Sequence, residues 1–285
     1  MTGRAHFSQY DQETTMRCER APVTLLGDLG PWRERLYLVG GLAPRYLVGT
    51  LPEDVQRHVG TTDIDLVVGM ALGDETPETY RTLRNNLEKS GFVQEEPSFR
   101  GSRYVDGVKV AVEFLCETDH VAPGHIFSPK GETTGSGFGA FNVRGAGLVR
   151  ADFFEVDIEG DRLDNGGRSR VTLRTANLLS YVVLKIFAFQ DRHENKDAYD
   201  MMFTLLNYPD GPRAAGAVAA TSAIAAHPQV KAAIELLAER FAVPDNDGPT
   251  AYARFLSEVD DMDALARRQR EAVATVQEFM SGFAG

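Results

Sequence analysis

The sequence has few cysteines and no long apolar run. Its two cysteines, Cys18 and Cys116, lack the spacing of a metal site and do not suggest a disulfide scaffold, so we expect two ordinary thiols. No run approaches the roughly 20 apolar residues that a membrane helix needs, and we expect no membrane partner. Residues 1–20 lack the continuous apolar core of a signal peptide, which predicts a cytoplasmic location.

Positive charge is also scarce. The chain has 30 lysines and arginines against 41 acidic residues, a formal net charge of −11 at pH 7. This excess argues against a broad surface for nucleic acids, although a local basic cleft remains compatible with it. The 285 residues are 43% hydrophobic and 25% charged, which suits a folded protein of one or two domains. We find no internal repeat.

The pattern VGTTDIDLVV at residues 59–68 carries the strongest chemical signal. In a strand, side chains two residues apart lie on the same face, so Asp63 and Asp65 would point the same way. Two neighbouring carboxylates are costly unless a positive charge lies between them, and Mg²⁺ is typically held by one or two carboxylates plus substrate phosphates. The alternative is a strand end with two solvated aspartates, which the pattern D-x-D alone does not exclude.

A strand and a glycine turn precede these aspartates. Residues 36–39 (LYLV) predict a short strand that runs directly into Gly40 and Gly41, and residues 42–49 then predict a short helix. Glycines let the backbone approach a ligand closely, and a helix start offers free N–H groups to an anion. A plain strand-to-helix turn is the alternative.

The polar connector before the aspartates contains His58, Thr61 and Thr62. We expect His58 to be a surface residue. Either threonine hydroxyl would contact a phosphate or only cap the turn. The connector therefore adds candidate phosphate contacts without deciding between them.

A third acid follows in a predicted hairpin. After a helix over residues 76–90, residues 99–105 and 109–115 predict two strands joined at Asp106-Gly107, a strong turn signal. The second strand places Glu113 among apolar neighbours. An acid in a core strand needs a reason, and a carboxylate that faces the aspartate pair would supply one.

Residues 119–147 are rich in glycine and proline and predict an irregular connection. Because no lysine follows the glycines, this segment is not a phosphate-binding P-loop. A mobile loop over a site is an alternative to a plain connection. Residues 153–158 and 170–173 predict two further strands.

The C-terminal part predicts helices. Thr175 would cap a helix over residues 176–192 that is apolar nearly all round and therefore deeply packed, and Asn195 would cap a second helix over residues 196–207. From residue 212 the chain is Ala-rich and predicts a helical bundle with no evident chemistry.

Two of these helices carry charges that need partners. Lys185 lies inside the apolar run, and the second helix carries Asp197 and Asp200. Lysine is rarely buried without a partner, so in a helix hairpin Lys185 and Asp200 would face the same cleft. The alternative is a lysine that reaches the surface and an aspartate on a solvated face.

Together these residues resemble a known family. The order of strand, Gly40-Gly41, short helix, Asp63-Ile64-Asp65, helix and strand with Glu113 resembles the nucleotidyltransferase core of DNA polymerase beta-like enzymes. Residues 178–206 resemble the Lys-x-x-Ala…Arg…Lys-Asp-x-x-Asp signature of the AbiEii/AbiGii toxin family of nucleotidyltransferases, which belong to type IV and related toxin–antitoxin systems. The resemblance covers residues 36–207.

The resemblance implies roles for the residues of the first half. The backbone of Gly40 and Gly41 would hold a triphosphate, with Thr62 as a further contact, and Asp63 and Asp65 would ligate Mg²⁺ or Mn²⁺.

It also implies roles for three later residues. Lys185 would neutralise triphosphate charge, and Asp200 would orient the acceptor or the lysine. Glu113 takes the place of a third carboxylate, as a metal ligand or base. In many family members that place is variable or has no acid, so its role stays open.

The expected fold follows from this reading. It is α+β, with residues 1–20 as a loosely docked arm, residues 21–173 as a mixed sheet flanked by helices, and residues 174–285 as a helical domain. The expected reaction is metal-dependent transfer of a nucleoside monophosphate from NTP to a hydroxyl of tRNA or protein, and a cognate antitoxin is an expected partner.

Two alternatives stay open. One is an adenylyltransferase for small molecules of the aminoglycoside type, which the acidic net charge favours because cationic substrates bind acidic clefts. The other is a non-catalytic module that senses nucleotides or binds a partner, although an intact set of Asp63, Asp65, Lys185 and Asp200 argues against it.

Overall fold

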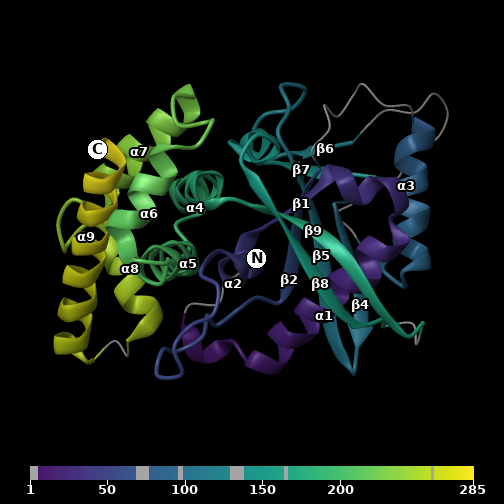
Figure 1. The fold of residues 1–285 in the computed structure, drawn as a ribbon, viewed down its shortest axis with the longest axis horizontal. Helices are drawn as coiled ribbons and strands as arrows, with labels where there is room; N and C mark the ends of the chain where they lie inside the picture. Colours follow the sequence, from purple (N-terminus) through teal and green to yellow (C-terminus); the bar gives the residue numbers. More distant parts are fainter. Residues whose placement is uncertain (1–5, 69–76, 96–98, 129–137, 164–165, 258–259) are drawn as a thin grey trace. The chain divides into compact units, whose positions relative to one another are not determined.

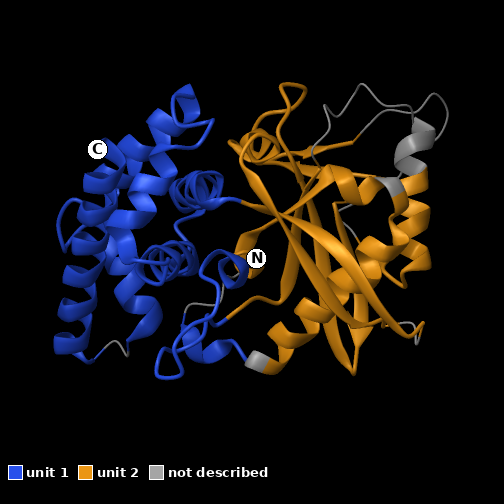
Figure 2. Ribbon diagram, in the orientation of Figure 1, with its two compact units in different colours: residues 1–11, 44–59, 177–285 blue, residues 12–43, 60–176 orange. Residues whose placement is uncertain are grey.

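The chain forms two compact units, shown in blue and orange in Figure 2. The computed structural model describes residues 6–68, 77–95, 99–128, 138–163, 166–257 and 260–285. The sheet unit comprises residues 12–43 and 60–176, and the helical unit comprises residues 1–11, 44–59 and 177–285. The predicted α+β class is confirmed, with a mixed sheet and C-terminal helices.

The sheet unit is built on one mixed sheet (Figure 1). Its strand order is β3-β4-β5-β2-β1-β9-β8, and β7 also pairs with β5 and with β6. The neighbours β2 and β5 are parallel, whereas β1 is antiparallel to β2. The strands are β1 Leu36–Val39, β2 Asp63–Val68, β3 Val93–Glu95, β4 Arg100–Val105, β5 Val108–Cys116, β6 Ile126–Phe127, β7 Ala140–Asn142, β8 Phe153–Asp161 and β9 Arg168–Ala176.

Alternation of side chains explains why β2 forms where it does. Ile64 and Leu66 are buried, while Asp63 and Asp65 are half-buried on the other face, as the sequence predicts. The two carboxylates therefore share one face of the strand.

The predicted hairpin is also confirmed. Strands β4 and β5 meet at Asp106 and Gly107, whose φ angles are 49° and 80°. Positive φ at both central residues is the signature of a two-residue hairpin turn that matches the twist of the strands.

Among its described residues, the sheet unit has two helices and three short 3-10 turns. They are α1 Gln12–Asp28 and α3 Pro77–Lys89, with η2 Gly30–Arg35, η3 Gly40–Leu42 and η4 Ala146–Arg150. Helix α1 packs against β5, β8 and β9 and contacts α3. The α3 helix was predicted over nearly the same residues.

Helix α1 corrects the prediction of a loose arm over residues 1–20. Its buried face includes Thr14, Cys18, Ala21 and Leu25, which are spaced as one helix face but are mostly small or polar. Pro22 lies within the helix and further obscures the pattern. A hydrophobicity reading therefore misses this helix.

The predicted irregular connection over residues 119–147 is only partly irregular. It contains β6, β7 and the start of η4, and β7 pairs with β5 at Leu115 and Phe141. Strands of two or three residues are too short for periodicity to reveal. Much of the glycine-rich stretch, residues 129–137, lies outside the described residues, as does residue 76.

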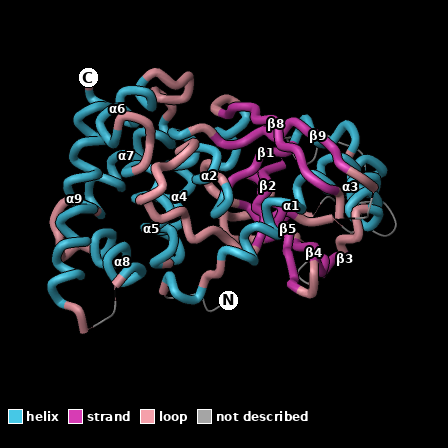
Figure 3. The backbone as a smooth tube through the Cα atoms, turned by 60° about the horizontal axis from the view of Figure 1, so that its bottom comes forward, coloured by secondary structure: helices cyan, strands magenta, loops and turns pink. Residues whose placement is uncertain are grey.

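The helical unit places α4 against α5 and α9 alongside α6 and α8 (Figure 3). Within the described residues, no helix is both long and apolar enough for a membrane span. The elements of this unit are η1 Phe7–Gln9, α2 Pro44–Leu47, α4 Leu178–Arg192, α5 Asn195–Leu206, α6 Gly211–Ala220, α7 Pro228–Arg240, α8 Asp247–Leu256 and α9 Met262–Ala284.

Both predicted caps of the central helix pair are displaced. The side chain of Asn177 accepts the N–H of Leu178 at 2.9 Å and caps α4, whereas Thr175 lies in β9. Asn195 is the first residue of α5, and Glu194 precedes it without a side-chain cap. The strand continues three residues beyond the predicted boundary, from residue 173 to Ala176, because Thr175 suits a strand as well as a cap.

Candidate functional site

The predicted site residues fall into two sets, one in each unit. Gly40, Gly41 and the residues of β2 and β5 belong to the sheet unit. Lys185 and Asp200 belong to the helical unit. Each set is described by itself.

In the sheet unit, the glycine turn lies directly against one of the aspartates. Val39, the last residue of β1, is the register partner of Asp65 in β2. Gly40 follows with φ of +67°, and a Cβ atom added there would collide with the Asp65 carboxylate. Only glycine permits both this backbone conformation and this contact. The glycine before D-x-D thus has a structural reason that involves the carboxylate itself.

The second aspartate is held by a neighbouring threonine. The hydroxyl of Thr61, which is buried, donates to Asp63 Oδ1 at 2.5 Å. Thr62 is half-buried, and its predicted contact with a phosphate stays a prediction. Of the two threonines, the first orients the carboxylate.

Glu113 lies beside Asp65 in the sheet but has its own partner. In the parallel pair β2–β5 it is the register partner of Asp65, and in the pair β4–β5 it is the register partner of Arg100. Its carboxylate forms an ion pair with the Arg100 guanidinium, and the two side chains are 14% and 20% exposed. The negative charge of Glu113 is therefore already compensated.

We call Asp63, Asp65, Glu113 and Arg100 the carboxylate row. Throughout the described part of the chain, no group of three or more His, Cys, Asp or Glu side chains is arranged to hold a metal ion. Asp63 and Asp65 are the two candidate metal ligands of the row, whereas Glu113 is paired with Arg100. This donor set fits Mg²⁺, which keeps waters and takes substrate phosphates, better than a metal that needs a full protein cage.

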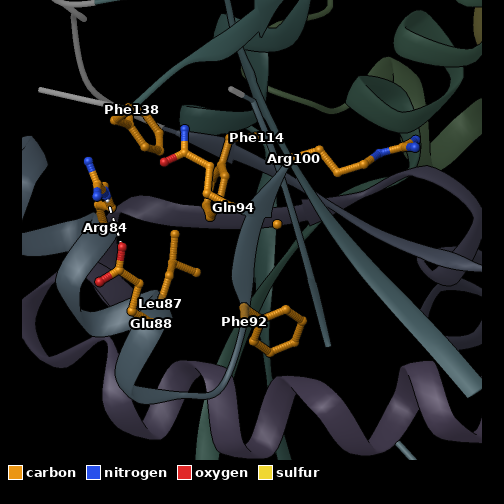
Figure 4. Close-up of a pocket in the computed structure, with 9 residues that line it drawn as sticks. Arg84, Leu87, Glu88, Phe92, Gln94, Arg100, Phe114 and Phe138 are labelled. Carbon is orange, nitrogen blue, oxygen red and sulfur yellow. Dashed lines mark hydrogen bonds and ion pairs between the residues drawn. The ribbon is translucent and has the colours of Figure 1, made fainter. Parts of the chain in front are cut away.

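A small cavity lies between α3 and strands β3 to β5 (Figure 4). Its volume of about 20 Å³ is enough for about one water molecule, whereas ligand pockets measure several hundred Å³. The Arg100 side chain points away from it (Figure 4). The cavity is therefore a packing gap that is too small to hold a nucleotide. It is lined by Arg84, Leu87, Glu88, Phe92, Gln94, Arg100, Gly101, Phe114 and Phe138.

In the helical unit, Lys185 is buried and paired, as one of the two interpretations predicted. Its Nζ lies 2.6 Å from Asp200 Oδ2 and 3.2 Å from Asp197 Oδ1. Helices α4 and α5 form the expected hairpin, and all three side chains are buried. The alternative of a lysine that reaches the surface is wrong.

The other charged residues of the signature join the same network. Arg192 donates to both oxygens of Asp197 at 2.6 and 2.7 Å. Lys196 donates to both oxygens of Asp200 at 2.7 and 2.9 Å. We call these five residues the lysine cluster; three cations meet two carboxylates, so it carries a surplus of positive charge.

The pKa values follow from this pairing. Burial opposes the charged form of Lys185, but Asp200 and Asp197 outweigh burial and raise the pKa of the ammonium. Burial likewise opposes the charged form of Asp200, but Lys185 and Lys196 hold its pKa well below the ordinary value. Both groups are therefore charged at neutral pH.

Sequence reasoning missed one member of this region. His58, predicted at the surface, is 1% exposed, and its Nε2 lies 2.8 Å from Asp200 Oδ1. Its partner is 142 residues away in the sequence, and the polar connector around it gives no sign of burial. Only the tertiary fold reveals this contact.

The chain was compared with protein-family models, with curated proteins and with solved structures, and none of the three gives a match. Function must therefore be argued from the two sets of residues. The carboxylate row provides oxygen ligands beside a glycine turn, which suits a hard cation with phosphate oxygens. The lysine cluster provides fixed positive charge, which suits an anion.

Proposed function

We propose that this chain is a nucleotidyltransferase that transfers a nucleoside monophosphate from NTP to an acceptor hydroxyl, with Mg²⁺ or Mn²⁺. The observation that carries the proposal is the contact between Gly40 and the Asp65 carboxylate, with Asp63 on the same strand face. The resemblance to the AbiEii/AbiGii toxins extends the proposal to tRNA or protein as acceptor and to an antitoxin as partner. We also propose, on the same grounds, that the mixed sheet is of the nucleotidyltransferase type.

Asp63 and Asp65 would hold the metal ion. When bound, the ion would compensate the charge that builds on the reacting phosphate and on the leaving pyrophosphate. The acceptor oxygen forms a bond to the α-phosphorus, and the bond to pyrophosphate breaks. The hydroxyl proton passes to a carboxylate of the row or to solvent. Transfer of this kind depends mainly on positioning and charge compensation, so few protein groups are needed.

The lysine cluster supports an anionic substrate. Its two carboxylates are fully hydrogen-bonded, yet Lys185, Lys196 and Arg192 together exceed them by one positive charge. The Arg192 side chain is 58% exposed, so this surplus of positive charge reaches solvent, where a phosphate group would stabilise it. We assign Lys185 to the triphosphate and Asp200 to the orientation of that lysine.

The test is a labelling assay with α-³²P-labelled NTPs, tRNA and cell protein, with and without Mg²⁺ or Mn²⁺. We expect wild type to transfer label and the double variant Asp63→Asn/Asp65→Asn to lose transfer by at least about a hundredfold. Asp161→Asn, an exposed aspartate at the end of β8, is the matched control and should behave as wild type.

Calorimetry with NTP and Mg²⁺ separates catalysis from sensing. A wild-type protein that binds NTP but transfers no label to any acceptor contradicts the catalytic proposal. Equal NTP binding by wild type and the double variant would also remove the carboxylate row from the site.

A further inference from the structure

The helical unit contains a buried histidine that the proposed function leaves without a role. His58 lies in the segment 44–59, which packs with the C-terminal helices. Its Nε2 is 2.8 Å from Asp200 Oδ1, and neither side chain has appreciable exposure to solvent. An imidazole nitrogen this close to a carboxylate oxygen must carry a proton, because two acceptors would repel each other. His58 is therefore a hydrogen-bond donor to Asp200.

Aromatic side chains of α5 fix the ring of His58. It stacks on Tyr199 with ring centroids 5.2 Å apart, and it meets the Phe203 ring edge-on at 4.9 Å. The backbone is also held, because Val59 N–H donates to the Tyr199 hydroxyl at 3.1 Å. The Arg45 guanidinium donates to the His58 carbonyl at 3.5 Å. Rotation of the imidazole away from Asp200 would break this packing.

The imidazole is neutral at physiological pH. Burial lowers the pKa of His58 to about 4, and the hydrogen bond and charge of Asp200 offset this only in part. The nearby cations Lys196 and Lys185 lower it further. His58 thus contributes a directed hydrogen bond without adding a further positive charge to the cluster.

The two oxygens of Asp200 divide their partners. Oδ1 accepts from His58 and from Lys196, while Oδ2 accepts from Lys185 at 2.6 Å and from Lys196. The histidine is the one of these donors that comes from outside α4 and α5. A donor fixed on Oδ1 leaves Oδ2 turned toward Lys185.

We propose that His58 is a positioning residue, which holds Asp200 so that Oδ2 stays on the Lys185 ammonium and keeps that ammonium fixed for a phosphate group of the substrate. The substrate clause rests on the proposed function. The positioning clause does not, since it concerns contacts within the helical unit. The two clauses can therefore fail separately.

Three substitutions distinguish positioning from mere packing. His58→Gln retains an N–H donor at nearly the same reach as Nε2. In His58→Asn the side chain is one bond shorter, so its N–H does not reach Asp200, and His58→Leu has no N–H donor in its side chain. We expect His58→Gln to hold Asp200 and the Lys185 ammonium as wild type does. In His58→Asn and His58→Leu we expect this positioning to be lost. His193→Gln, an exposed histidine of the same unit, is the matched control.

The first measurement is independent of catalysis. In ¹⁵N-labelled protein, we expect His58 to show the Nε2–H tautomer and no titration between pH 8 and pH 5. We expect the Lys185 ammonium, assigned with Lys185→Arg, to exchange its protons at least about tenfold faster in His58→Leu than in His58→Gln. A titration of His58 near pH 6.5, or equal exchange in both variants, would overturn the proposal.

The second measurement uses NTP transfer. We expect His58→Leu to raise KM for NTP by about tenfold with a smaller change in kcat, and His58→Gln to restore it. A wild type that transfers nothing would sink the proposed function and leave the exchange experiment valid. If the Lys185 ammonium exchanges faster in His58→Leu but KM for NTP does not change, the substrate clause alone is overturned.

Discussion

The carboxylate row and the lysine cluster differ in how far their charges are withdrawn from water. Asp63, Asp65 and Glu113 lie on a half-exposed face of the sheet. In the cluster, Asp197 and Asp200 are fully buried, and each accepts several charged hydrogen bonds. Half-buried charges that still reach water cost less to keep without a ligand than fully buried charges, which require permanent partners. Under the proposed function, the row would be completed by its cation, whereas the ion pairs of the cluster are already formed without a ligand.

The largest predicted effect tests this difference through stability. Asp200→Asn removes the charge that compensates Lys185 and Lys196, and breaking one partner of a buried pair typically costs about 3–5 kcal/mol. Asp63→Asn removes a half-exposed charge and should cost less than about 1 kcal/mol. Urea unfolding followed by circular dichroism gives both values. Similar losses in the two variants would contradict the comparison.

The second effect is a loss of stability in mild acid. The pKa of His58 is about 4 in the folded chain and 6.5 ordinarily, so between these values the unfolded chain binds more protons. The free energy of unfolding therefore falls as pH drops from 6.5 to 4, by roughly 3 kcal/mol in all. Thermal unfolding at successive pH values measures this slope.

His58→Gln is the control for that slope. The variant has no imidazole to protonate, so its stability should stay nearly level across the same pH window. Asp197 and Asp200 have lowered pKa values, so their contribution is complete above their ordinary value of 3.8 and is lost only below it. Equal slopes in wild type and His58→Gln would show that another group titrates.

Much of the fold could be predicted from the sequence, because local signals coincide with the tertiary structure. Strand Leu36–Val39 ends at Gly40 as its composition indicates, and Asp106-Gly107 forms the expected turn. Helix α1 was missed because its buried face uses small and polar residues. What fails here is the assumption that a packed face must be apolar.

The site was predictable to the extent that its residues lie close in sequence. Lys185 and Asp200 belong to consecutive helices, so burial of the lysine requires a partner nearby. His58 reaches Asp200 across 142 residues, and no local pattern encodes that contact. The pairing of Glu113 with Arg100 could have been suspected, since the hairpin turn fixes their register.

The third effect concerns the turn beside the row. In Gly40→Ala, the left-handed conformation costs about 1–2 kcal/mol, and the new Cβ displaces the Asp65 carboxylate. We expect NTP transfer to fall by at least about tenfold. Gly30→Ala is the matched control, because Gly30 has φ of +56° and no atom near the added Cβ. Equal loss of transfer in both variants would mean that strain alone matters.

The smallest effect decides how many carboxylates the row offers. Arg100→Ala, Glu113→Gln and the double variant form a cycle, and this mostly buried pair should show a coupling of about 1 kcal/mol in unfolding free energy. The sequence resemblance leaves Glu113 open as a metal ligand or a base, whereas its ion pair makes it a partner of Arg100. Under the second interpretation, Glu113→Gln leaves the Mg²⁺ concentration for half-maximal transfer unchanged. A rise of tenfold or more in Glu113→Gln, with Arg100→Ala unaffected, would show that Glu113 is a third ligand and that the row resembles the cluster in needing all its charges.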